Sequence, residues 1–307
     1  MLERILIPLD GSPVAERAIA QAARFLRRPG TEVILVRVVE TQDMDPEGFG
    51  GLIPRLKLEA AEYLAGVSGK LREAGWRVRA SVEEGRPLER ILETAAREKA
   101  TLVALASHGR TGLARWVMGS VAEKVVRACP VPVLVLRPIG AGSDGGTAAT
   151  PEAAPAFRKL LVPIDGGPGS LAAVESAAIV AKLCGSSIVL VHVESRLDFP
   201  PGTYSARLVD VPRNPPAGPV PGDPGKRLDH LGCLLAFRGL SVTTLRVGGD
   251  AASRIVDLPA ELGADVIVMA THGRKGLSRF ILGSVAEKVL RQTTLPLLVI
   301  PPAGDGP

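Results

Sequence analysis

The feature of this sequence that most constrains its fold is a long internal repeat. Residues 107–136 align without a gap with residues 271–300, and 17 of these 30 positions are identical. The starts of the two halves also match, since residues 4–11 align with residues 159–166. The offset is 155 residues at the start and 164 at the end, so the second copy has a net insertion of nine residues. A period of this length corresponds to a whole domain, and the chain of 307 residues is predicted to contain one domain twice.

Two segments of unusual composition divide the chain further. We expect the first domain to span residues 1–138 and the second residues 157–301, with a linker of residues 139–156 between them. The linker has no apolar periodicity and consists largely of Gly, Ala, Pro and Thr. Asp198–Gly225, with eight prolines and four glycines in 28 residues, is incompatible with a helix interior. We expect it to form a long surface loop or lid in the second domain.

Strand and helix patterns alternate in each copy. The strand runs are apolar almost throughout, which is typical of parallel strands that helices cover on both faces. We therefore predict an α/β fold with two tandem Rossmann-like, doubly wound domains, each a five-stranded parallel sheet flanked by helices. The predicted strands are 4–9, 32–39, 77–83, 101–106, 132–137, 159–164, 187–193, 241–247, 265–270 and 296–300. The predicted helices are 13–27, 52–73, 88–98, 119–128, 170–184, 226–238, 251–262 and 283–292.

Charge, hydropathy and cysteine content argue against several classes of protein. The net charge of +5 divides almost evenly between the halves without a basic run or tail, so we expect no nucleic acid as a partner. No stretch approaches the roughly 18 apolar residues of a membrane span, and the N-terminus lacks a signal-peptide pattern. The three cysteines and four histidines have neither disulfide-framework nor metal-ligand spacing. The expected location is the cytoplasm, with no membrane as a partner.

A glycine-rich loop after the predicted fourth strand carries the most informative signal for function. It contains Gly109 and Arg110 and ends at Gly119 and Ser120, where a helix is predicted to begin. Glycines let backbone N–H groups approach a phosphate, and a helix N-terminus adds N–H donors and a partial positive charge. The loop is therefore a candidate polyphosphate site. A structural alternative is that Ser120 only caps its helix, because S-V-A-E in both copies fits the S-x-x-E capping box.

These segments together resemble the universal stress protein family over nearly the whole of each half. The resemblance rests on ILIPLDGS near the start of the chain, the Gly85-Arg86-Pro87 turn and the block of thirty residues that closes each copy. The nucleotide motif of that family is G-x2-G-x9-G-S/T. Both copies fit its later part, whereas an alanine replaces its first glycine. The positions concerned are Ala106, Gly109, Gly119 and Ser120 in the first copy and Ala270, Gly273, Gly283 and Ser284 in the second.

The resemblance implies an ATP site, with or without Mg²⁺, in each copy. Asp10 and Asp165 would face the adenosine, and the backbones of Val38 and Val193 would frame the base. Alternatively, each aspartate caps the helix that follows it, and the valines are ordinary strand core. If one copy alone binds, we expect the first, because the second departs from it in the turn after its aspartate. The full set of expected nucleotide-binding residues is Pro8, Asp10, Val38, Ala106, Gly109, Arg110, Gly119, Ser120, Val121, Pro163, Asp165, Val193, Ala270, Gly273, Gly283, Ser284 and Val285.

The function that the resemblance implies is that of a cytoplasmic stress-response protein whose ATP occupancy acts as a switch. The alternative is a dimerising interaction module with weak or no nucleotide binding. ATP hydrolysis is expected to be weak at most, because the chain lacks a G-x4-G-K-[ST] loop, a G-x-S-x-G elbow and paired carboxylates for acid–base catalysis. We expect the apolar end strands, 131–136 and 295–300, to meet near a pseudo-two-fold axis. The tandem chain would then mimic a homodimer, and two such chains could associate further.

Overall fold

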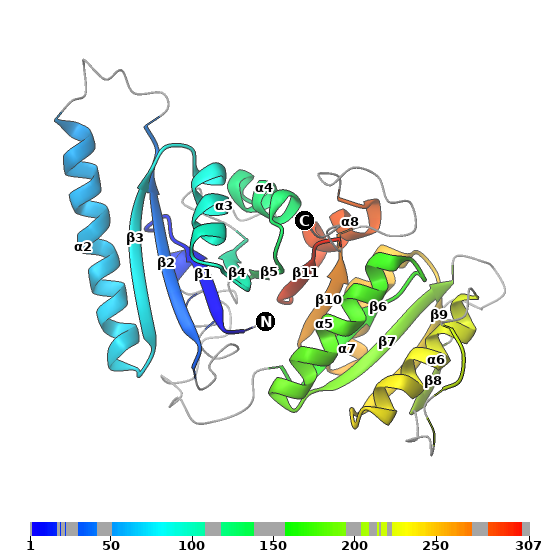
Figure 1. Ribbon diagram of the computed structural model, residues 1–307. Coiled ribbons are helices and arrows are strands. Elements are labelled where there is room, and N and C mark those ends of the chain that lie inside the picture. The colour runs from blue at the N-terminus through cyan, green and yellow to red at the C-terminus, as the bar shows by residue number, and fades with distance from the viewer. Residues whose placement is uncertain are drawn as a thin grey trace. The chain divides into compact units, whose positions relative to one another are not determined.

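The computed structural model divides into two units by its internal contacts, Met1–Ala153 and Ala154–Pro307 (Figure 1). Each unit contains one copy of the repeat. The structure describes residues 2–16, 19, 22, 30–41, 51–107, 118–137, 157–194, 204–208, 214, 216–219, 223–271 and 282–302. The predicted linker, residues 139–156, lies outside the described residues.

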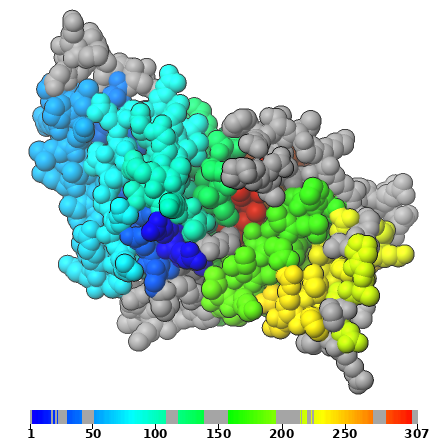
Figure 2. Space-filling model, in the orientation of Figure 1, coloured from blue at the N-terminus to red at the C-terminus, as the bar shows by residue number. Residues whose placement is uncertain are grey.

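The first unit contains a five-stranded parallel sheet with helices on both faces. Its elements are β1 (Arg4–Pro8), β2 (Glu32–Val39), α2 (Leu52–Glu73), β3 (Arg77–Glu84), α3 (Pro87–Arg97), β4 (Leu102–Ala106), α4 (Ser120–Ala128) and β5 (Val133–Leu136). The strand order is β3-β2-β1-β4-β5, and every neighbouring pair is parallel. The helix α2 packs on β2 and β3, while α3 packs with α4 on the opposite face (Figure 1). In Figure 2, the residues of α2, β3 and α3, in light blue and cyan, form much of the visible surface of this unit.

The second unit repeats this architecture and adds one strand. Its elements are β6 (Lys159–Pro163), α5 (Pro168–Cys184), β7 (Ser187–Glu194), β8 (Tyr204–Leu208), α6 (Pro224–Phe237), β9 (Val242–Gly248), α7 (Ala251–Leu262), β10 (Val266–Ala270), α8 (Ser284–Gln292) and β11 (Leu297–Ile300). The strand order is β11-β10-β6-β7-β9-β8. The first five of these strands are parallel, and β8 pairs with β9 in the antiparallel direction. The predicted fold class, two tandem doubly wound domains, is confirmed.

The additional strand corrects the prediction for the proline-rich insertion. We expected Asp198–Gly225 to be a surface loop throughout, but Tyr204–Leu208 forms β8. The strand lies in the longest stretch of the insertion without Pro or Gly, and it pairs with the otherwise open edge of β9. The end of the insertion supplies the N-cap and the first two residues of α6: the Asp223 carboxylate accepts the Lys226 N–H at 2.8 Å, and Pro224 opens the helix.

The central strands of both sheets are buried, as their apolar runs predicted. Ile5, Leu6, Leu160 and Leu161 have no exposed surface. The strand order reverses at β1 in the first unit, because β2 and β3 lie on one side of it and β4 and β5 on the other. It reverses in the same way at β6 in the second unit. The carboxyl ends of β1 and β4, and of β6 and β10, are therefore the places where such a fold binds ligands.

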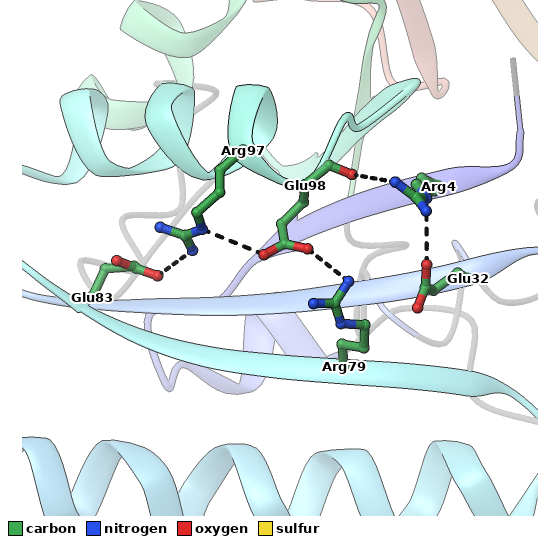
Figure 3. A network of polar contacts seen from close by, with 6 residues as sticks. All are labelled: Arg4, Glu32, Arg79, Glu83, Arg97 and Glu98. Atoms are coloured by element: carbon green, nitrogen blue, oxygen red, sulfur yellow. Dashed lines mark hydrogen bonds and ion pairs between the residues drawn. The ribbon is translucent and has the colours of Figure 1, made fainter.

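A network of charged side chains ties three strands of the first unit to α3. It consists of Arg4, Glu32, Arg79, Glu83, Arg97 and Glu98 (Figure 3). The pair Arg97–Glu83 has an N–O distance of 2.6 Å, and Arg79–Glu98 has one of 2.8 Å. The glutamate side chains are 14–18% exposed and the arginine side chains 42–56% exposed, so water screens each pair and each contributes little by itself. No helix within the described ranges is both long and apolar enough to cross a membrane.

Candidate functional site

The first part of the candidate site is the turn that follows β1. The backbone N–H of Leu9 donates to Val36 O on β2, which fixes the end of the strand. The Asp10 Oδ1 atom then accepts the Ser12 N–H at 2.9 Å, across Gly11, whose φ of 81° favours glycine. Ser12 is the helix cap, because its Oγ accepts the Ala15 N–H at 3.2 Å. Asp10 therefore orders the turn and does not cap the helix, and its second oxygen has no hydrogen-bond partner among the described residues.

The second unit builds the same turn with a different cap. The Asp165 Oδ1 atom accepts the Gly167 N–H at 2.8 Å, and Gly166 has a φ of 84°. Gly167 is the N-cap of α5 and has no side chain to accept a helix N–H, whereas Ser12 in the first unit does. The two aspartates therefore accept the same turn N–H, but the helix start is held differently: in the second unit the Ser170 hydroxyl donates to Gly167 O at 2.8 Å.

The second part of the candidate site is the base of the glycine-rich loop. The Gly119 N–H donates to Ser107 O at 2.8 Å, so the loop returns to the residue at which it leaves β4. Ser107 is fully buried and its N–H donates to Leu136 O on β5, which anchors this point to the sheet. Gly283 and Thr271 repeat the closure at 2.8 Å in the second unit. The interior of each loop, with Gly109, Arg110 and Gly273, lies outside the described residues.

The start of α4 overturns the capping-box interpretation. The N-cap is Gly119, and Ser120 is the first helical residue, with an exposed side chain. Glu123 does not reach back to the cap: its carboxylate pairs with Arg127 at 2.8 Å. In the second unit, Gly283 is likewise the N-cap of α8 and Glu287 pairs with Arg291 at 2.9 Å.

A glycine at the N-cap has consequences for ligands. Glycine supplies no side-chain oxygen to accept the first helix N–H groups, and the first helical hydrogen bond of α4 is the one from Glu123 N to Gly119 O at 3.0 Å. The N–H groups of residues 120–122 precede that bond and have no partner within the helix. Such a helix start is suited to an anion, because the donors and the helix dipole both favour negative charge.

The parallel pairing of the strands brings most of the predicted site residues to the carboxyl end of the sheet in each unit. The strand β1 pairs with β4 on one side and with β2 on the other, and all three end at the same edge. The residues that the structure places there are Pro8, Asp10, Val38, Ala106, Gly119, Ser120 and Val121 in the first unit and Pro163, Asp165, Val193, Ala270, Gly283, Ser284 and Val285 in the second. Within each unit, the Asp turn and the helix start thus flank the point at which the strand order reverses.

Arg37 and Tyr63 also belong to this edge, and the sequence analysis missed them. Arg37 precedes Val38 on β2, and its Cζ lies 4.9 Å from the centroid of the Tyr63 ring on α2. A Cβ atom added to Gly11 would lie 3.2 Å from the Arg37 guanidinium, so the guanidinium packs on the turn beside Asp10. Burial and the carboxylate of Glu16 raise the pKa of Tyr63 to about 12, although Arg37 acts in the opposite direction. The signal in the sequence was an arginine within an apolar strand, next to a predicted site residue.

Comparisons with known proteins agree with this architecture. The model of the universal stress protein family matches residues 1–137 and 156–301. A universal stress protein of Mycobacterium tuberculosis is 26% identical over 316 residues, which cover 96% of each chain. One of Methanocaldococcus jannaschii is 35% identical over 141 residues, 45% of this chain and 83% of that protein. The crystal structure of a universal stress protein from Archaeoglobus fulgidus matches with a TM-score of 0.72 at 21% identity, over 100% of this chain and 98% of the other, which supports the fold alone.

Proposed function

The chain belongs to the universal stress protein family, and on that premise we propose that it is a stress-response protein that binds ATP at the carboxyl edge of each sheet, with the first unit as the main site. The observation that carries the proposal is the glycine-capped start of α4 beside the turn of Asp10. A helix start with uncapped N–H donors suits phosphates, and a carboxylate on the adjacent strand suits ribose hydroxyls or an amine.

The proposed roles follow the order of the strands. The phosphates lie at Gly119, Ser120 and Val121, the ribose lies near Asp10, and the base lies against the backbone of Val38. Gly109 and Arg110 are expected to bind the phosphates as well, as the family motif implies. Among the described residues, no group of three or more His, Cys, Asp or Glu side chains is suited to hold a metal ion, so we assign no protein ligand to Mg²⁺.

An interaction module with weak nucleotide binding is the second candidate. Two features of the sequence favour this candidate, namely the alanines at the first motif position and the predicted capping boxes. The capping boxes do not form, since Gly119 and Gly283 are the N-caps. Ala106 and Ala270 remain in its favour, because each places a methyl group at the end of a strand where the family motif has glycine.

Calorimetric titration of the full chain with ATP separates the two candidates. We expect binding tighter than about 1 mM at the main site of the wild type. In Gly119→Asp we expect that site to be lost and only the weaker site of the second unit to remain, because a carboxylate at the N-cap repels phosphate and occupies the N–H donors. Gly66→Asp is the matched control, since a Cβ at Gly66 on the exposed side of α2 would meet no atom within 4 Å. Unchanged binding in Gly119→Asp, or no binding by the wild type, would favour the interaction module.

A further inference from the structure

The guanidinium of Arg37 is half-buried and lies at the edge of the proposed nucleotide site. Its Cζ atom lies over the Tyr63 ring, 4.9 Å from the centroid. Within the part of the chain that the structure describes, no hydrogen bond or ion pair engages its N–H groups. A guanidinium held by a ring keeps N–H groups available to an acceptor, and two of these groups can bind the oxygens of a phosphate together.

Arg37 gives the proposed site a second group that attracts anions, on the side of β1 opposite to the start of α4. The strand β2, which carries Arg37, lies on one side of β1, and β4, which leads to the start of α4, lies on the other. Asp10 stands between them at the end of β1. A ligand across this edge thus meets the N–H donors of α4 at one end and the cation of Arg37 at the other, with the Asp10 carboxylate between.

Resting on the proposed function, we propose that Arg37 makes the first unit selective for an adenine nucleotide that carries a phosphate on a ribose hydroxyl in addition to its 5′ phosphate. Asp10 is the group assigned to the ribose, and the Arg37 guanidinium packs on the glycine next to it. A phosphate on the 2′ or 3′ oxygen would therefore reach the guanidinium. In other doubly wound folds, an arginine near the adenine ribose serves the same purpose for a 2′-phosphate.

The second unit lacks this arrangement. His192 occupies on β7 the position that Arg37 has on β2, and its Nδ1 lies 2.9 Å from Ile164 O. Through that contact, Nδ1 of His192 is engaged by the backbone carbonyl of Ile164, directly after β6. Arg227 stands on α6 at the offset of 164 residues from Tyr63, so no aromatic side chain occupies the equivalent place. The second unit is expected to bind 5′ nucleotides without a preference for a ribose phosphate.

The test compares AMP with adenosine 2′,5′-bisphosphate and adenosine 3′,5′-bisphosphate by calorimetry. The full chain carries Gly283→Asp so that the first unit is measured alone. We expect one of the bisphosphates to bind at least about tenfold more tightly than AMP, because it adds a bidentate charge-assisted contact. Arg37→His, which introduces the residue of the second unit, is expected to reduce that ratio to less than about twofold. Arg37→Lys keeps the positive charge but loses the paired N–H donors of the guanidinium, and it is expected to retain part of the ratio.

Arg79→His is the control, because Arg79 lies on β3 with its guanidinium paired to Glu98 at 2.8 Å. It is expected to leave the ratio unchanged. Equal binding of AMP and both bisphosphates, or a ratio that survives in Arg37→His, would overturn the role of Arg37 while ATP binding stands. If neither ATP nor any of the other nucleotides binds the wild-type chain, the proposed function itself is overturned.

Discussion

Asp10 has two roles that substitution can separate. Its Oδ1 atom holds the turn by accepting the Ser12 N–H at 2.9 Å, and its charge is assigned to the nucleotide. Asp10→Asn retains an oxygen that can accept the Ser12 N–H but removes the charge. Asp10→Ala removes both. The two variants are therefore expected to differ in stability and to agree in their loss of ATP binding.

The magnitudes follow from the environment of the turn. The Asp10 side chain is half-buried, so loss of its hydrogen bond in Asp10→Ala is expected to lower the free energy of unfolding by about 1 kcal/mol. Asp10→Asn is expected to change it by less than about 0.5 kcal/mol. For ATP, each variant loses a charge-assisted hydrogen bond worth about 1–3 kcal/mol, which raises Kd roughly 5- to 150-fold.

Tryptophan fluorescence during urea unfolding measures the stability of the first unit alone, because both tryptophans of the chain, Trp76 and Trp116, lie in it. Calorimetry measures ATP binding. Ser12→Ala is the control: it removes the helix cap, at a cost of about 0.5–2 kcal/mol in stability, and is expected to leave Kd within about twofold. ATP binding by Asp10→Asn at the wild-type affinity would refute the contact between carboxylate and nucleotide. If Ser12→Ala lost as much affinity for ATP as Asp10→Ala, the loss in Asp10→Ala would be due to disruption of the turn.

Three further predictions concern stability and assembly. Desolvation raises the pKa of Glu83, but the hydrogen bond and the charge of Arg97 lower it more. The stabilising contribution of Glu83 is therefore present at neutral pH and lost as the pH falls through the lowered pKa. Between pH 7 and pH 3, urea unfolding should show a smaller decrease in the free energy of unfolding for Glu83→Gln than for the wild type. Gly85→Ala should lower Tm more than Gly30→Ala, because Gly85 has a φ of 127° and its Cβ would meet Arg90 Nε at 3.0 Å, whereas that of Gly30 would meet nothing within 4 Å. Residues 1–138 expressed alone should dimerise through the apolar strand β5 in sedimentation experiments, and a monomer would contradict the predicted pairing of end strands.

The sequence predicted the elements well where the signal is local or repeated. The helix 52–73 and the helix 251–262 were predicted with the ends that the structure shows, and the core strands within one or two residues. Buried positions need apolar side chains, so the pattern of apolar and polar residues along the chain indicates directly which positions of a strand or helix are buried. The repeat then placed the glycine-rich loop and the aspartate turn at corresponding points in both units.

Features that depend on contacts distant in sequence were missed or wrong. The capping box at Ser120 failed because loop closure from Gly119 N to Ser107 O determines where α4 begins, one residue earlier than the S-x-x-E pattern requires. The strand β8 depends on the open edge of β9, about 35 residues further along the chain. The Arg37–Tyr63 contact joins β2 to α2, and strand patterning indicates only that an arginine interrupts an apolar run.

The proposed nucleotide site requires that the phosphates bind the N–H groups at the start of α4. Backbone amide NMR shifts of the full chain during titration with ATP test it most directly. We expect large, saturable shifts for Ser120 and Val121, smaller ones for Gly11 and Ser12, and none for Gly66 on α2. Shifts confined to other elements, with the amides of Ser120 and Val121 unmoved at saturating ATP, would contradict the claim.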